Sequence, residues 1–424
     1  MTSTEFEKAT DYALTDADIE RAHLLLGVDV ATKHMEHITT ATFDSIRNFA
    51  WGVGDDNPLY CDEDYGTATR WGSQVAPNSM AQIVAAPLLG DPMPAEIKAA
   101  TKGLFRGIHV FVSGGSMDWY RPIFPGDKLY AFSGEESIEV KDSEFAGRSV
   151  IQVSRDVKFN QRGEVVSAQR VLRVLAERKT ARERGKNNEI EPASYTDDDI
   201  AAIDAIYASE QRRGADVRWW EDVSVGDAMS PMVKGPLTTT EVVAFHAGGY
   251  GFVPYGLKSS RLAYKNRMRI APFFVKNSQG VPDVAQRLHW DSDWAKAIGN
   301  PMAYDYGVMR QCWFQHYTND WAGDDAFVTR QSDSMRKFNY HGDVQHLSGS
   351  VVGKREEGGL KLVDLQMKMT NQRGVDTSFA DVTVCLPSRK AGQALMPVVP
   401  EDLQRRATAM YERHNQLLAE KKRS

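Results

Sequence analysis

The chain has 424 residues, of which 42% are hydrophobic and 25% charged, and its formal net charge is −6. This length is too great for one hydrophobic core, so we expect two domains. The negative net charge argues against a general nucleic-acid-binding protein, because such proteins usually have more basic than acidic residues. No apolar run approaches the ~20 residues that a membrane span needs. The N-terminus is polar and acidic, unlike a signal peptide.

The cysteines also restrict the class of protein. Cys61, Cys312 and Cys385 lie far apart, without the spacing of a metal site or a disulfide framework. We therefore expect a cytoplasmic protein with no metal ion. Buried, inert thiols are the simplest interpretation, and a nucleophilic role for Cys61 or Cys312 stays open.

The first half, residues 1–177, is predicted to form one module. Residues 39–50 place apolar side chains at helical spacing behind threonines, which are good N-caps. A Gly-Asp turn at 126–127 precedes a strand. The Asn-Gln-Arg-Gly segment at 160–163 predicts a tight hairpin turn, because its glycine accepts positive φ. The β-branched residues of 165–175 predict the strand that follows.

A polar region separates the two halves. Residues 177–192 are almost wholly polar, as in a solvated linker. A short helix is expected at 196–213, so linker and helix together occupy residues 178–215.

The second half, residues 216–390, repeats the pattern of the first. It has a threonine-opened helix at 238–247, a Gly-Asp turn at 342–343, and Asn-Gln-Arg-Gly at 371–374 before a strand at 375–386. Three features in the same order indicate two similarly built modules, although one large domain with coincidental turns is the alternative. Runs of strands beside helices favour an α+β fold.

The end of the chain, residues 391–424, is predicted to form a charged helix. Its regular part spans 400–424 and is expected to pack across the face of a module.

Polar motifs follow the first helix of each module. In the first half this motif is Gly-Asp-Asp-Asn-Pro-Leu-Tyr at 54–60, with Asp62 downstream. In the second half Gln-Arg-Leu-His-Trp-Asp occupies 286–291, and Tyr-Asp-Tyr-Gly occupies 304–307. Both stretches resemble the signature of the MaoC-like (R)-specific enoyl-CoA hydratases, which runs Gly-Asp-x-Asn-Pro-x-His-x-Asp and continues to a His-Gly-Met-like turn. The resemblance covers most of the chain, as two tandem copies.

Each copy departs from the signature at one place. Tyr60 stands where the family has its catalytic histidine. The second copy keeps His289 and Asp291, and it is similar to the His-Arg-Ile-His-Tyr-Asp variant of methylfumaryl- and mesaconyl-CoA hydratases. Gly-Gly-Tyr at 248–250 replaces its Gly-Asp, and an inserted loop spans 251–286.

The resemblance implies a double hot-dog, in which each module is an antiparallel sheet wrapped around a central helix. We expect the modules to pair sheet edge to sheet edge, which also protects exposed edges. The implied reaction is hydration of a 2-enoyl-CoA or dehydration of a 3-hydroxyacyl-CoA. Coenzyme A would enter only as part of the substrate, and no other cofactor is implied.

The resemblance also implies catalytic roles. His289 would be the general acid/base, and Gly307 would open a buried helix whose N–H groups bind the enolate oxygen. The carboxylate that partners His289 is not fixed. We favour Asp283, while Asp291, Asp305, or Asp55 from the first module are alternatives. Both residues also have a non-catalytic interpretation. His289 could be a hydrogen-bonded core histidine, and Asp55 could serve only to form a turn.

Further residues are candidates for binding the acyl-CoA substrate. They are Asp291, Tyr304, Asp305, Tyr306, Asn57 and Tyr60 near the motifs, and Arg261, Lys265 and Arg267 in the inserted loop. The basic residues could hold the phosphates of coenzyme A or belong to a solvated lid. We expect a homo-oligomer, a dimer of chains, without nucleic-acid or membrane partners. A hot-dog thioesterase and a non-catalytic acyl-CoA-binding partner subunit remain alternative functions.

Overall fold

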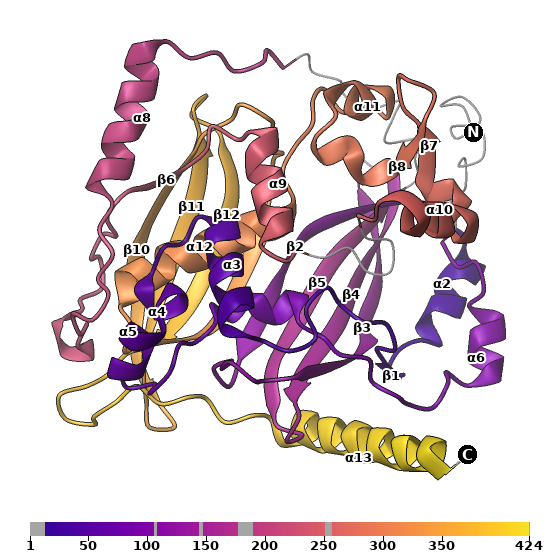
Figure 1. Ribbon diagram of the computed structural model, residues 1–424, viewed down its shortest axis with the longest axis horizontal. Coiled ribbons are helices and arrows are strands. Elements are labelled where there is room, and N and C mark those ends of the chain that lie inside the picture. The colour runs from indigo at the N-terminus through magenta and orange to yellow at the C-terminus, as the bar shows by residue number, and fades with distance from the viewer. Residues whose placement is uncertain (1–12, 106–107, 144–146, 177–189, 251–256, 424) are drawn as a thin grey trace.

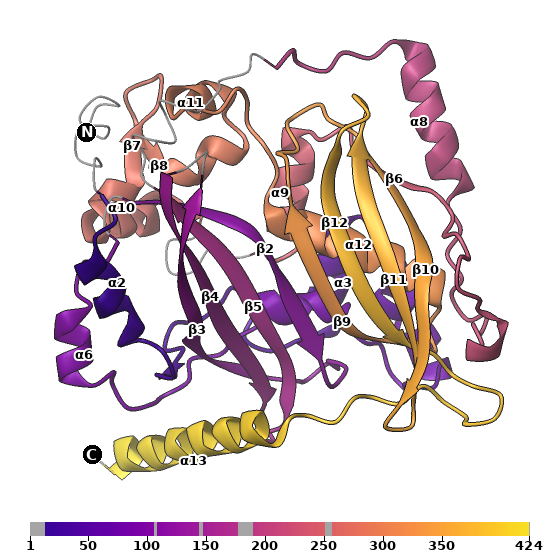
Figure 2. The same cartoon turned by 180° about the vertical axis from the view of Figure 1, so that it is seen from behind.

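The computed structural model describes residues 13–105, 108–143, 147–176, 190–250 and 257–423. Among these residues, ten strands form one continuous sheet in the order β1-β3-β4-β5-β2-β9-β12-β11-β10-β6. The first five strands in this order come from the first half of the chain and the last five from the second. The halves lie side by side (Figure 1) and join edge to edge between β2 and β9 (Figure 2), so the expected edge-to-edge pairing of the modules is confirmed.

In the first half, mostly short helices come first and four long strands follow. They are α2 (Asp16–His23), β1 (Val30–Ala31), α3 (Phe43–Val53), α4 (Pro58–Cys61), α5 (Glu63–Ala68), η1 (Asn78–Ile83), α6 (Ala95–Ala100), β2 (His109–Trp119), β3 (Leu129–Ser143), β4 (Gly147–Asn160) and β5 (Val165–Ala176).

The second half contains the longest helices. Its elements are α8 (Asp197–Ser209), η2 (Trp220–Asp222), β6 (Met232–Lys234), α9 (Thr239–Ala247), α10 (Ser260–Arg269), η3 (Ala271–Phe273), β7 (Phe274–Lys276), β8 (Pro282–Val284), η4 (Ala285–His289), α11 (Ser292–Ala297), α12 (Gly307–Ala322), β9 (Phe327–Met335), β10 (Gln345–Glu357), β11 (Leu360–Asn371), β12 (Asp376–Cys385) and α13 (Glu401–Arg423).

The two threonine-opened helices are confirmed and meet at the module boundary. Thr42 caps α3 and Thr238 caps α9, each in a capping box. The helices approach so closely that a Cβ on Gly52 would lie 2.9 Å from the Cα of Gly248. Because both helices also contribute to one core with α12, the two modules fold around shared apolar contacts.

The modules differ in their central helix. In the second module α12 spans 16 residues and is buried along most of its length. At the corresponding point before β2, the first module has only the six-residue 3-10 helix η1. The next residues form strand-like bonds instead: Ala85 N–H donates to Ile38 O at 3.0 Å, and Ala86 N–H donates to Leu129 O at 2.7 Å. The α+β class is confirmed. In the first module, however, the expected central helix is reduced to the short 3-10 helix η1.

The C-terminal helix α13 packs against the first module, as expected (Figure 2). Leu403 and Ala407 are buried in a cluster with Phe132 and Phe159, and the Tyr411 hydroxyl donates to Gln161 O at 2.6 Å. The end of the chain thus returns to the module that begins it. No helix in the described ranges is long and apolar enough to cross a bilayer.

The inserted segment is more regular than a loop. Residues 251–256 lie outside the described residues, and the remainder forms α10, η3, the β7–β8 hairpin and the start of η4. In both views these elements gather with α11 at one end of the molecule (Figures 1 and 2).

Asp333 carries a buried carboxyl group beneath α12. We expect it to make the unfolding free energy of the protein depend on pH. The Gln311 amide donates to its oxygens at 3.0 and 3.2 Å, and burial raises the pKa of Asp333 to about 7. Between the unfolded pKa of about 3.9 and pH 7, the folded state binds more protons, so stability falls as pH rises. We expect Asp333→Asn to leave the unfolding free energy nearly unchanged at pH 4. At pH 8 the substitution should raise it, by up to about 4 kcal/mol.

Chemical denaturation of both proteins at pH 4, 6 and 8 measures this difference. A stability difference independent of pH would show that Asp333 is ionised in the folded protein.

Candidate active site

Aromatic and histidine side chains gather at the N-terminus of α12. His289, the last residue of η4, lies against Tyr306 with ring centroids 3.7 Å apart. The His246 Nε2 lies 3.1 Å from the Tyr306 hydroxyl. Tyr306 is the N-cap residue of α12 and makes no side-chain capping bond. The structure therefore brings His289, Tyr304, Tyr306 and Gly307 together, as the sequence predicted.

The hydrogen bonding of His289 defines its tautomer. Its Nδ1 lies 2.9 Å from the carbonyl oxygen of Tyr304, which can only accept, so Nδ1 carries the proton. With the proton on Nδ1, Nε2 carries the lone pair, and no side chain of the described residues bonds to it. Burial lowers the pKa of His289 to about 4, so the ring is neutral near pH 7. A neutral imidazole held by a carbonyl is arranged as a proton acceptor.

The first turn of α12 offers backbone donors beside this imidazole. Its first N–H groups have no acceptor within the helix, and the helix dipole is positive there. A Cβ on Gly307 would lie 2.7 Å from the Met335 sulfur, so a side chain at this position would displace the thioether. Such a terminus can stabilise a developing oxyanion.

The predicted carboxylate partners lie elsewhere. No carboxylate of the described residues is within the 4.0 Å ion-pair distance of His289. Asp283 accepts from the Val284 N–H, and Asp291 caps α11 while pairing with Arg287 at 3.1 Å. Asp305 pairs with Arg310 at 2.9 Å, and burial raises the pKa of Asp305 to about 6. The His289 ring is therefore oriented by the backbone carbonyl of Tyr304, whereas we expected a carboxylate in that role.

Two basic candidates of the inserted segment, Arg261 and Lys265, are exposed, and the third, Arg267, is partly buried. Arg261, Lys265 and Arg267 lie on α10, which has no buried residue. The guanidinium of Arg267 lies over the Tyr264 ring at 5.6 Å. Their assignment to coenzyme A phosphates stays a prediction.

Asp55 lies in a different, buried cluster between the modules. The ammonium of Lys234 lies 2.7 Å from His316 Nδ1, and the other ring nitrogen, Nε2, lies 3.8 Å from Asp55 and 3.4 Å from Asp320. An ammonium can only donate, so Nδ1 accepts and Nε2 bears the proton facing the two carboxylates. Burial lowers the pKa of His316 to about 4 and raises that of Asp55. This cluster pairs the first module's aspartate with α12 of the second.

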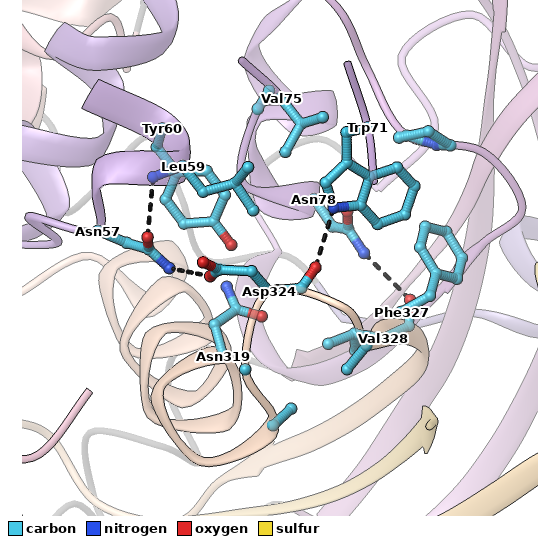
Figure 3. A pocket seen from close by; sticks show the side chains of 15 residues that line it. Asn57, Leu59, Tyr60, Trp71, Val75, Asn78, Asn319, Asp324, Phe327 and Val328 are labelled. Carbon is cyan, nitrogen blue, oxygen red and sulfur yellow. Dashed lines mark hydrogen bonds between the residues drawn. The ribbon is translucent and has the colours of Figure 1, made fainter. Parts of the chain in front are cut away.

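Asn57 and Tyr60 line a small cavity beside this cluster (Figure 3). Asn57 donates to Asp324 at 3.0 Å and accepts from the Leu59 N–H at 2.9 Å. The Trp71 indole donates to Asp324 O at 2.9 Å. The cavity of about 40 Å³ holds a few waters at most, because each needs roughly 10–15 Å³. Asn57 therefore joins the modules in this structure.

Sequence reasoning missed Lys234, His316 and Asp320. Lys234 follows apolar residues in β6, and His316 lies within a helix of mostly buried side chains. Their partners are 82 or more residues away, apart from the His316–Asp320 helical pair. No local signal could have joined them. Within the described ranges, no three or more histidine, cysteine, aspartate or glutamate side chains are placed so that they could hold a metal ion.

Part of the chain is similar in sequence to known proteins. The family described as "FAS1-like, dehydratase domain region" matches residues 26–169. A curated relative from Thermomonospora curvata, "Probable enoyl-CoA hydratase alpha subunit", is 30% identical over 132 residues. This match covers 30% of the chain and only 41% of that relative.

Structural similarity extends further along the chain. A solved structure described as "MaoC-like dehydratase" has a TM-score of 0.55 at 15% identity, and the match covers 85% of this chain and 98% of that one. The chain therefore has the double hot-dog fold over most of its length, and its residues 26–169 match the FAS1-like dehydratase domain region.

Proposed function

We propose that the protein adds water to a 2-enoyl-CoA, or dehydrates a 3-hydroxyacyl-CoA, with His289 as its acid/base. The observation that carries the proposal is the Nδ1 bond from His289 to the Tyr304 carbonyl, which leaves Nε2 unprotonated beside the N-terminus of α12. In hydration, Nε2 takes a proton from water as its oxygen attacks the β-carbon. The thioester oxygen gains the negative charge near Gly307, and His289 then returns a proton to the α-carbon.

A non-catalytic acyl-CoA-binding subunit is the second candidate. Its support is specific: His289 has no carboxylate partner among the described residues, and the curated relative is named as an alpha subunit. A hot-dog thioesterase is a third candidate, since the same helix terminus could polarise a thioester for hydrolysis.

One assay distinguishes these functions. We expect linear, branched, aromatic or steroid-like 2-enoyl-CoA esters to lose their enoyl-thioester absorbance without release of free thiol. Thiol release in parallel would replace the proposal by a thioesterase. Binding of acyl-CoA without turnover of any ester would replace it by a binding subunit.

The proposal includes a cytoplasmic protein that associates as a dimer of chains and uses no cofactor beyond the substrate's coenzyme A. The three free cysteines support a reducing compartment. Light scattering of the purified chain measures its oligomeric state.

A further inference from the structure

A second pocket lies at the other end of α12 from His289. It has a volume of about 190 Å³ and lies between the segment that follows α8 and the last turns of α12. Tyr317 is ten residues beyond Gly307, or about 15 Å along the helix axis. A water needs roughly 10–15 Å³, so the pocket has room for a multi-atom ligand.

Two buried polar atoms in this pocket lack partners. The hydroxyl of Tyr317 and the Oδ1 of Asp320 are buried and make no hydrogen bond, and the two residues are only 3% and 8% exposed. Both belong to α12 and both line the pocket. Buried polar groups are nearly always paired, so an unpaired donor and an unpaired acceptor in one pocket point to a missing ligand.

Two guanidinium groups also face the pocket without carboxylate partners. Arg218 donates to the Trp321 carbonyl at 2.6 Å and stacks over the Trp321 ring at 4.3 Å. Arg213 donates to backbone carbonyls, at 2.9 Å for Asp216. No carboxylate of the described residues lies within 4.0 Å of either group. Desolvation and the neighbouring Arg213 lower the pKa of Arg218 to about 10, an effect that a bound anion would reverse.

The lining also holds three acidic residues, Glu210, Asp216 and Asp320. Two of them have other partners: Asp320 Oδ2 lies 3.4 Å from His316, and Glu210 accepts from the Val233 N–H at 2.9 Å. The lining therefore combines guanidinium groups with polar atoms on α12 that can form hydrogen bonds, and a bare anion would use only the guanidinium groups.

We propose that this pocket binds a phosphate monoester that carries hydroxyl groups. Arg213 and Arg218 hold the phosphate, since a guanidinium fork matches phosphate oxygens. The ligand's hydroxyls meet Tyr317, which can donate or accept, and Asp320, which accepts. Two sources share this chemistry: the nucleotide end of coenzyme A and a free phosphorylated sugar-like metabolite. The first source rests on the proposed function, whereas binding of the probes is measured without turnover at His289.

Calorimetry of the full chain with three probes tests the proposal: inorganic phosphate, ribose 5-phosphate and adenosine 3′,5′-bisphosphate. We expect saturable binding, with at least one hydroxylated probe bound more tightly than inorganic phosphate. Preference for the bisphosphate nucleotide assigns the site to coenzyme A, and preference for ribose 5-phosphate assigns it to a free metabolite. Absence of saturable binding up to about 10 mM of every probe overturns the proposal.

Three variants locate the binding. Arg218→Gln should weaken every probe about tenfold or more. Tyr317→Phe should weaken only the hydroxylated probes, about tenfold, and leave inorganic phosphate unchanged. Arg70→Gln is the matched control, because Arg70 also stacks on a tryptophan, Trp71 at 4.1 Å, and donates to a carbonyl, that of Asp325. The proposed site would be contradicted if Arg70→Gln weakened binding as much as Arg218→Gln does. It would also be contradicted if Tyr317→Phe left the affinity for the hydroxylated probes unchanged.

Discussion

Replacing His289 by glutamine should lower kcat/KM for the active enoyl-CoA ester by about 10²–10⁴-fold, the usual contribution of a general acid/base. Glutamine can still donate a hydrogen bond to the Tyr304 carbonyl, as Nδ1 does at 2.9 Å, but it cannot take a proton. The loss should therefore fall on kcat, while KM changes little. Steady-state kinetics, with the melting temperature measured in parallel, separates chemistry from folding.

His346→Gln is the matched control. His346 is a partly buried histidine on β10 whose pKa is also lowered by burial, and its strand pairs with β6, away from the α12 N-terminus. It should retain nearly full turnover. If His289→Gln kept more than about a tenth of the wild-type kcat/KM, His289 would be a core histidine and the catalytic base would lie elsewhere.

Local signals explain which parts of the fold could be predicted. Thr238 and Glu241 form a capping box within four residues, so the start of α9 was visible in the sequence. The hairpin at 160–163 depends on Asn160 and a glycine with φ of +77°. The pairing of the modules sheet edge to sheet edge was expected from the double hot-dog that the resemblance implies, since open edges protect each other. The strands that pair, β2 and β9, were not predicted.

Non-local contacts explain the rest. The central helix of the first module is shortened because the residues after Ile83 bond to two distant segments, at Ile38 and Leu129. The substitute for a carboxylate beside His289 is a carbonyl, which every residue carries, so composition gives no hint of it. Likewise, Asp55 meets His316 only because α12 crosses the module boundary.

The junction of β2 with β9 forms the seam between the modules. We expect a single methyl group added at Gly115 to destabilise it. β2 lies between β5 and β9, where Gly115 pairs with Val171 on one side and Asp333 on the other. A Cβ at this position would lie 2.2 Å from the carbonyl oxygen of Arg170, and that oxygen belongs to the backbone of a central strand. Strands cannot yield locally as a side chain can, because a shift would break the ladder on both sides.

We therefore expect Gly115→Ala to cost at least about 3 kcal/mol of unfolding free energy, at or beyond the upper end of overpacking effects. Gly353→Ala on β10 is the matched control. Its Cβ would contact only the Asp364 side chain, with Oδ2 at 2.9 Å and Cβ at 3.3 Å. That side chain can shift more readily than a strand backbone, although its carboxylate also binds Arg355 and Thr383. Chemical denaturation of both variants measures the contrast. Because the seam joins one ten-stranded sheet, Gly115→Ala should lower the stability of both modules together. Separate transitions in which only the first module is weakened would show that the modules are stable without their shared edge.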